Sequence, residues 1–185
     1  MRLDKARVET KEMDEWTEED QKIMQPFVDA GDVHNIFKTL LQHPDLMRRW
    51  LVFANHILFK STLPPREREL VILRIGYLCN AGYEWGQHVL ISRKIGMNEE
   101  TIASTKIGPG APGISEIDSL LMKATDELHE DAFVTDSTWN SLLEHFQPKQ
   151  LMDLVFTVGQ YNLVSMALNT LGVQPDDGLP DWELK

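Results

Sequence analysis

The sequence predicts an all-α protein, a helical bundle that follows an N-terminal arm. Apolar residues recur at spacings of three and four along most of the 185-residue chain, which is the period of a helix buried on one face. No run of residues alternates apolar and polar side chains as a half-buried strand does. Proline and glycine separate the apolar segments, most clearly in the loop GPGAPG over residues 108–113.

The first elements follow from this period. Residues 1–31 are polar and acidic, and we expect an arm or a short helix that ends near Gly31. An amphipathic helix is expected next and is stopped by His43-Pro44. A second helix is expected from about Asp45 to Phe59. The apolar faces of these two helices comprise Val33, Ile36, Phe37, Leu40 and Leu41, and Leu46, Trp50, Phe53, Ala54 and Ile57.

Two helices joined by a break are expected in the middle of the chain. Pro64-Pro65 starts a helix that runs to about Cys79, because proline is tolerated in the first helical turn. Asn80-Ala81-Gly82 interrupts the pattern, and the next helix spans about residues 83–95, before Gly96. Asn98 is a suitable N-cap for a short helix after it.

Three C-terminal helices are expected after the glycine-rich loop, over about residues 115–131, 136–146 and 148–171. The tail that follows them is expected to be extended. The predicted organisation is therefore an arm over residues 1–31, one helical domain over residues 32–173, and a tail over residues 174–185.

Composition excludes several classes of function. With 42% hydrophobic and 25% charged residues the chain resembles a folded protein. The net charge of -11 argues against nucleic acid and against an anionic membrane surface as partners. We find no apolar run of the roughly 18 residues that a membrane span needs, and no signal peptide in MRLDKARVETKEMDEW, so a cytoplasmic location is expected. Cys79 is the single cysteine, which excludes an intramolecular disulfide.

The stretch NAGYEWGQH holds the first candidate residues for chemistry. Glu84 and His88 are four positions apart and therefore share one face of the expected helix. One interpretation is a surface pair that stabilises the helix slightly. The other is a buried pair, because Tyr83 and Trp85 beside it are bulky and a buried Glu or His needs a partner. In that case an ionised Glu84 would fix the imidazole tautomer and raise its basicity, as in a general acid or base.

Glu69 is a third candidate. If the helices on either side of Asn80 pack antiparallel, Glu69 lies level with His88 or Ser92, which is compatible with a contact between Glu69 and His88. A Glu and a His four apart are also a permitted pair of metal ligands. The two Glu-x-x-His motifs of bundle metal sites are absent, however, and we predict no metal.

The motif LPPRERELVILRIGYLCNAGYEWGQHVLISRKIGM resembles the core of the carboxymuconolactone decarboxylase family, within the AhpD-like (alkylhydroperoxidase D-like) superfamily. The resemblance is strong over residues 60–107 and weaker over residues 115–173. It implies an all-helical AhpD-like bundle and a homo-oligomer, a trimer or hexamer.

In the peroxidase branch of this superfamily, two cysteines, a histidine and a glutamate form the site. His88 matches the histidine and Glu69 the glutamate, whereas Ala81 and Glu84 stand at the two cysteine positions. Thiol–disulfide chemistry needs a thiolate and a partner thiol, so the resemblance does not extend to this activity.

The segment YEWGQH, residues 83–88, resembles the decarboxylase branch, whose enzymes work without a metal or an organic cofactor. The resemblance implies a lyase acting on a small cyclic carboxylic acid or lactone, with His88 as proton donor or base, oriented by Glu84 and Glu69. A related lyase or hydrolase and a non-catalytic oligomer that binds a small molecule stay open as alternatives.

Substrate binding is assigned to four residues around this group. Arg74 or Arg66 would hold a substrate carboxylate, because a guanidinium group pairs with carboxylates. Tyr83 and Trp85 would lie beside the substrate. The expected partner is thus a small, carboxylated molecule.

Overall fold

A computed structural model describes residues 3–180 and 182–184. Within these residues the chain forms nine α-helices and one short 3-10 helix, with no strand, so the predicted all-α fold is confirmed. The elements are η1 (Met13–Glu15), α1 (Glu18–Ala30), α2 (Asn35–Leu40), α3 (Pro44–Phe59), α4 (Pro65–Leu78), α5 (Gly82–Lys94), α6 (Glu99–Ile107), α7 (Glu116–Asp131), α8 (Asp136–Leu143) and α9 (Pro148–Leu171).

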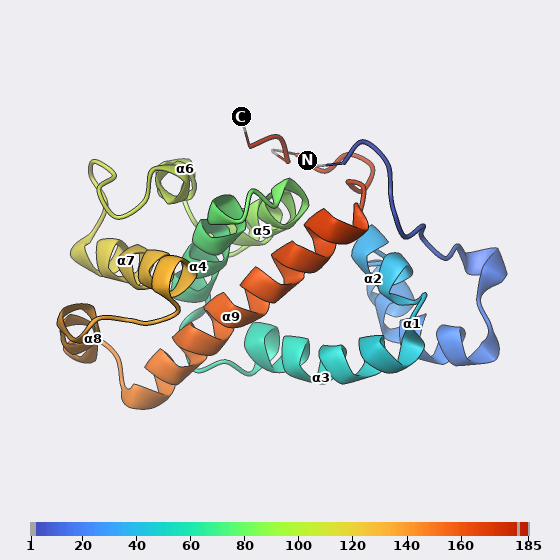
Figure 1. The fold of residues 1–185 in the computed structure, drawn as a ribbon, viewed down its shortest axis with the longest axis horizontal. Coiled ribbons are helices and arrows are strands. Elements are labelled where there is room, and N and C mark those ends of the chain that lie inside the picture. Colours follow the sequence, from blue (N-terminus) through green and yellow to red (C-terminus); the bar gives the residue numbers. More distant parts are fainter. Residues whose placement is uncertain (1–2, 181, 185) are drawn as a thin grey trace.

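Helix α4 forms the centre of the domain and packs against α5, α6, α7 and α9. Figure 1 shows α9 crossing the molecule diagonally, with α6, α7 and α8 at one end and α1, α2 and α3 at the other. The run Glu69–Gly76 of α4 is buried without interruption. A helix covered on every side has no polar face, which explains why the apolar pattern of α4 is weak.

The ends of the helices show where local chemistry controls the chain. Gly31 ends α1 in the left-handed conformation, as expected, and Asn98 caps α6 by accepting a hydrogen bond from the backbone N–H of Thr101 at 2.7 Å. Pro44, expected to stop a helix, is the first residue of α3, a position that tolerates its missing N–H. Helix α8 is three residues shorter than expected and ends at Leu143.

The break between α4 and α5 differs from the prediction by one residue. Gly82 was expected in the break but begins α5, and Asn80 adopts the left-handed conformation instead, with φ at 51°. Asparagine tolerates this conformation better than most residues. The turn is therefore tight, and α5 folds back along α4.

The two ends of the chain pack together on the outside of the bundle. The backbone N–H groups of Arg7 and Val8 donate to the carbonyl oxygen of Leu171, at the end of α9. The tail after α9 has no helix in its described part, as expected, and crosses α5 at Gly82 and Gly86. The arm residues are thus anchored to the C-terminal end of α9.

Helix α9 alone is long and apolar enough to cross a membrane by length and composition, in the described part of the chain. Half of its apolar window is buried inside the fold. The buried core helix of a globular domain meets the same criteria, and α9 has that position here.

Candidate active site

The turn at Asn80 brings the candidate residues of α4 and α5 together. Because the two helices run antiparallel, Gly76 of α4 lies against the backbone of Trp85. Glu69 precedes Gly76 in α4 by about two turns, and it therefore lies level with His88 of α5. The expected contact between Glu69 and His88 is present.

His88 lies between two carboxylates. Its Nδ1 atom is 2.6 Å from Oε2 of Glu69, and its Nε2 atom is 3.1 Å from Oε1 of Glu84. All three residues are buried, and Glu69 is 0% exposed. The ring of Tyr161, from α9, packs edge-on against the imidazole with ring centroids 4.8 Å apart. The sequence allowed either a surface pair or a buried pair of Glu84 and His88, and the structure shows the buried pair.

The two carboxylates decide the charge of His88. Burial lowers the pKa of the imidazole, but the negative charges and hydrogen bonds of Glu69 and Glu84 raise it more, to about 9. The ring is therefore an imidazolium at neutral pH. Burial, together with the charges of Glu84 and Glu69, raises the pKa of Tyr161 well above its ordinary value, so its hydroxyl group stays neutral.

Arg68 is a member of this group that the sequence did not reveal. Its Nε atom donates to Oε1 of Glu69 at 3.2 Å, and it opposes the rise in the pKa of the nearby Tyr161 hydroxyl. Adjacent residues of a helix point in different directions, so a pattern of spacing does not pair Arg68 with Glu69. The contact arises because the long arginine side chain bends back to its neighbour.

Arg74 and Arg66, the two arginines that the sequence suggested for substrate binding, bind aspartates of α7. Arg74 donates to both carboxylate oxygens of Asp126, at 2.6 and 2.8 Å, and to the carbonyl oxygen of Thr105 at 2.9 Å. Arg66 forms a similar two-pronged pair with Asp118 at 2.7 and 2.8 Å. Both guanidinium groups therefore tie α4 to α7, and neither contacts His88 in this structure.

Tyr83 and Trp85 flank Glu84 in the sequence but face away from it in the fold. The Tyr83 hydroxyl donates to Asp176 of the tail at 2.7 Å and accepts from the backbone N–H of Ile36 at 3.3 Å. The Trp85 ring is buried with the ammonium group of Lys106 4.4 Å from its centre. Three successive residues of α5 therefore have different contacts. Tyr83 binds the tail, Glu84 contacts His88, and Trp85 packs in the core.

The single thiol lies apart from His88. Cys79 follows the last residue of α4, and its Sγ atom donates to Oδ1 of Asn162 at 3.0 Å. Its Sγ atom is also 3.9 Å from Nδ1 of His129. Ala81 and Glu84, which the resemblance to the peroxidase branch aligns with its two cysteines, carry no thiol.

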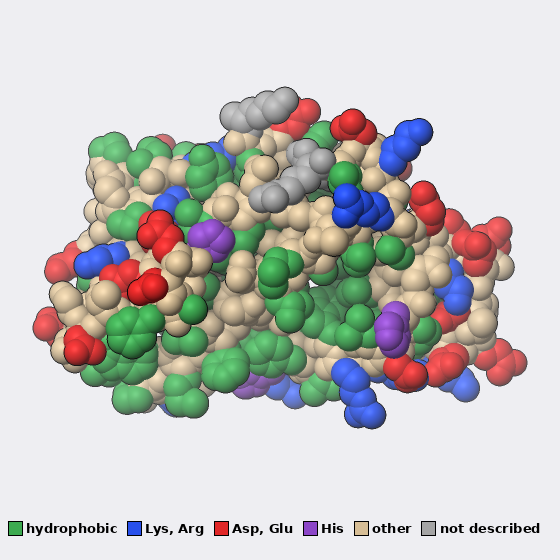
Figure 2. Space-filling view, viewed as in Figure 1, with side chains coloured by type: hydrophobic (Ala, Val, Ile, Leu, Met, Phe, Trp, Pro, Cys, Tyr) green, Lys and Arg blue, Asp and Glu red, His purple; other side chains and the backbone are tan. Residues whose placement is uncertain are grey.

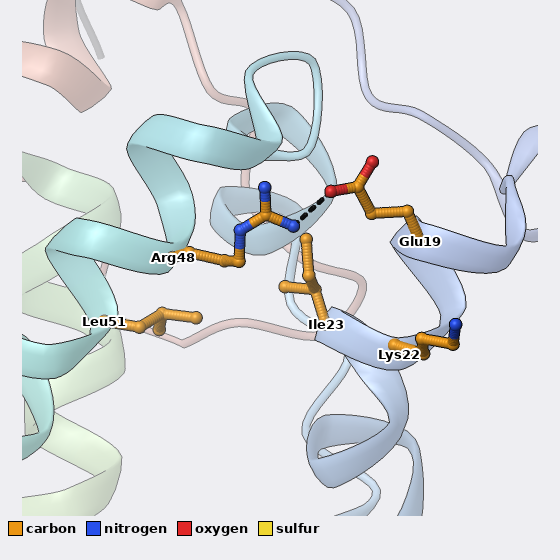
Figure 3. A pocket seen from close by; sticks show the side chains of 5 residues that line it. All are labelled: Glu19, Lys22, Ile23, Arg48 and Leu51. Carbon is orange, nitrogen blue, oxygen red and sulfur yellow. Dashed lines mark hydrogen bonds and ion pairs between the residues drawn. The ribbon is translucent and has the colours of Figure 1, made fainter.

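Two pockets on the described surface lie away from the His88 group, and none of its residues lines either of them. One, of about 560 Å³, opens between α1 and α3, where Arg48 points toward Glu19 (Figure 3). The other, of about 570 Å³, lies between the arm, α2 and the tail. In the described part of the chain no group of three His, Cys, Asp or Glu side chains is arranged to hold a metal ion.

Comparison with protein families matches residues 44–106 to the carboxymuconolactone decarboxylase family. This segment runs from the start of α3 to the end of α6 and includes Glu69, Glu84 and His88. A search of curated proteins finds no match.

Several solved structures share the fold. An alkylhydroperoxidase AhpD core protein from Ralstonia eutropha, described as an uncharacterized peroxidase-related protein, has a TM-score of 0.82 and 20% identity over 94% of each chain. An uncharacterized peroxidase-related protein from Silicibacter has a TM-score of 0.82 and 12% identity, covering 99% of this chain and 100% of its own. A protein of unknown function from Agrobacterium tumefaciens, whose description names AhpD, has a TM-score of 0.69 and 19% identity over 74% of this chain and 94% of its own. At these identities the likeness concerns the fold alone, which is AhpD-like.

Proposed function

We propose that the protein is a cofactor-free lyase of the carboxymuconolactone decarboxylase type, because residues 44–106 match that family. Its substrate is a small cyclic carboxylic acid or lactone, and His88 is the general acid and base. The position of His88 between Glu69 and Glu84 carries this proposal. A buried imidazole with a carboxylate at each nitrogen is suited to proton transfer.

The raised pKa of His88, about 9, supports a proton-donating role at neutral pH. In a decarboxylation the bond between the substrate carbon and its carboxylate breaks, and carbon dioxide leaves. The electron pair of that bond stays on the carbon skeleton, where a neighbouring carbonyl group can accept it. The carbon then takes up one proton from the imidazolium of His88, which regains a proton from water.

The two nitrogens of His88 have different roles in this mechanism. Nδ1 is held at 2.6 Å by Glu69, which is 0% exposed and therefore has no access to a substrate. Nε2 faces Glu84 across a longer distance of 3.1 Å. Glu69 is thus the orienting residue, and we assign the exchange of the proton with substrate to the Nε2 and Glu84 side.

A thiol peroxidase is the competing proposal, since two structural relatives are described as peroxidase-related. Peroxide reduction by thiols forms a sulfenic acid that a second thiol resolves. The chain has one cysteine, and its thiol contacts Asn162 rather than His88. A carboxylate at position 84 cannot form a disulfide, so these observations favour proton transfer over redox chemistry.

Release of carbon dioxide from a panel of small carboxylated lactones and cyclic keto acids tests the proposal. We expect turnover by the wild type and a loss of about 100- to 10,000-fold in kcat for His88→Gln, the usual weight of general acid–base catalysis. His145→Gln is the matched control, because His145 is exposed in the turn between α8 and α9. Equal rates for the wild type and His88→Gln would contradict the role of His88. No turnover by a folded wild type would favour a non-catalytic, ligand-binding role.

We also propose that the protein is a homo-oligomer. Helix α9 exposes a stripe of large apolar side chains, each 50–58% exposed: Met152, Phe156, Leu163 and Met166. Phe53 of α3 continues the stripe and packs edge-on against Phe156, and hydrophobic side chains gather over α3 and α9 in Figure 2. An apolar surface of this extent on a folded chain is typical of an interface, here with a second copy.

A further inference from the structure

We propose that the pocket between the N-terminal arm, α2 and the tail, here called the arm pocket, binds a small organic diamine. Such a ligand is a short alkyl chain with an ammonium group at each end. The arm pocket has a volume of about 570 Å³, which is enough for a small molecule. Its lining comes from three segments that are far apart in the sequence, within residues 6–12, 31–39 and 173–177. The site is separate from the His88 group and does not depend on the proposed lyase activity.

Thr39 of α2 brings to the arm pocket a buried polar atom that lacks a partner. The residue lines the pocket and is 2% exposed, and its Oγ1 atom has no hydrogen-bond partner among the described residues. Three other buried threonines, Thr105, Thr125 and Thr157, each donate to a backbone carbonyl oxygen of their own helix. A buried hydroxyl group without a partner costs free energy, and a ligand with N–H donors would remove that cost.

The two basic side chains of the arm pocket are already paired with carboxylates. Nζ of Lys38 lies 2.9 and 3.0 Å from the two carboxylate oxygens of Glu12. Nδ1 of His34 lies 3.1 Å from Oδ2 of Asp176. All four residues line the pocket, and neither basic group is left to attract an anionic ligand.

Two further carboxylates in the lining have no counter-charge. Glu9 of the arm and Asp177 of the tail are exposed, and their side chains form no ion pair or hydrogen bond with the other described residues. The chain as a whole has a net charge of -11, so the surrounding field also favours a cation. One carboxylate comes from each of two segments, and a ligand with two ammonium groups would neutralise both.

The remaining lining favours an organic chain between the two charges. Ala6, Val33 and Val173 present apolar side chains to the pocket, against which methylene groups can pack. A divalent metal ion prefers a cage of several oxygen ligands. No three His, Cys, Asp or Glu side chains in the described part of the chain are arranged to provide one. The lining therefore fits an alkyl diamine better than a bare metal ion.

Isothermal titration calorimetry with 1,4-diaminobutane at neutral pH tests the inference. We expect the wild type to bind it and Thr39→Val to bind it about 10-fold more weakly, the weight of a buried hydrogen bond to a charged group. Thr39→Ser keeps the hydroxyl group and should keep most of the affinity. Glu9→Gln and Asp177→Asn should each weaken binding about 2- to 5-fold, as expected for ion pairs exposed to solvent.

Two controls separate a built site from general attraction to an acidic protein. Glu144→Gln removes an exposed carboxylate just after α8, at the other end of the molecule from α2, and should leave the affinity unchanged. The neutral analogue 1,4-butanediol has the same chain length and should not bind. Circular dichroism checks that each variant is folded, and Glu9 and Asp177 are exposed, so their variants test the site even if Thr39→Val does not fold.

Three results would overturn the inference. The first is a wild type that binds no 1,4-diaminobutane. The second is an equal loss of affinity in Glu144→Gln, Glu9→Gln and Asp177→Asn, which would show attraction to the net charge alone. The third is an affinity that none of the variants at Thr39, Glu9 and Asp177 changes, which would place the diamine elsewhere on the chain.

Discussion

Glu69 and His88 are 19 residues apart in the sequence, and their side chains are 2.6 Å apart in the fold. Both are buried, so water and salt screen their attraction little. The pair joins α4 to α5 at the level where Glu84 reaches the other nitrogen of the ring. One contact thus stabilises the central helix hairpin and fixes the nitrogen that His88 can present to a ligand.

The first prediction concerns the charge of His88. A titration followed by NMR of the histidine ring protons should give the wild type a pKa of about 9. Glu69→Gln removes the closest negative charge and should lower the pKa of His88 clearly, because burial then opposes the imidazolium with one carboxylate fewer. Glu84→Gln should lower this pKa as well.

The exposed His145 provides the internal reference in the same spectra. A His88 that titrates near the ordinary value of about 6.5 in the wild type would show that the carboxylates do not control its charge.

The contact between Glu69 and His88 could be predicted from the sequence because it depends on few features. A short break between two helical patterns implies an antiparallel hairpin, and the rise of 1.5 Å per residue then places Glu69 beside His88. Spacing within one helix likewise placed Glu84 on the same face as His88. These are relations between neighbours in the chain or across one turn.

The roles of the arginines could not be predicted in the same way. Arg66 and Arg74 are each 52 residues from the aspartate that binds them, and no local pattern indicates which helices meet across the core. The contact of Asp176 with Tyr83 spans 93 residues. Such pairs depend on the packing of whole helices, whereas Arg68 was missed because its contact depends on the conformation of one long side chain.

The second prediction is the pH dependence of stability. The folded-state pKa of His88 is raised, so its protonated form contributes stability that is fully present below the ordinary value of about 6.5 and is lost as pH rises through about 9. Urea unfolding of the wild type and His88→Gln over this range should therefore give a difference in unfolding free energy that shrinks toward alkaline pH. A difference that grows with pH would contradict the ion pairs.

The third prediction concerns the thiol. Wild type and Cys79→Ser should consume hydrogen peroxide at the same background rate in the presence of a small-molecule dithiol, because Cys79 has no second cysteine to resolve a sulfenic acid. The oxidation of the dithiol gives the measurement. Sustained turnover by the wild type that is lost in Cys79→Ser would support a peroxidase and weaken the proposed lyase.

The fourth prediction tests the oligomer. Leu163→Glu places a charge in the apolar stripe of α9, where the side chain is 50% exposed, and burial of that charge in an interface would be costly. Light scattering coupled to size-exclusion chromatography should show a smaller assembly than the wild type. Ile107→Glu is the control, since Ile107 is 63% exposed on α6, away from the stripe. If both variants have the same mass as the wild type, the stripe is not part of an interface between copies of the chain.

The fifth prediction concerns the tail that crosses α5. Asp176 accepts hydrogen bonds from Tyr83 and from the backbone N–H of Asn35, which fixes the tail where it passes the helix that carries Glu84 and His88. A Cβ atom at Gly82 would collide with the backbone carbonyl oxygen of Trp182, which cannot move without the tail. Gly82→Ala should therefore lower the unfolding free energy by about 1–3 kcal/mol, the usual cost of overpacking.

Limited proteolysis should also cut the tail of Gly82→Ala faster than that of the wild type. Gly110→Ala is the control, because a Cβ atom there meets open space at the surface of the loop over residues 108–113. The sign of the change in unfolding free energy for Gly82→Ala shows whether the tail packs on α5. Alanine is favoured over glycine in a helix that nothing crosses, so a stabilised Gly82→Ala would mean that the tail does not rest on α5 in solution.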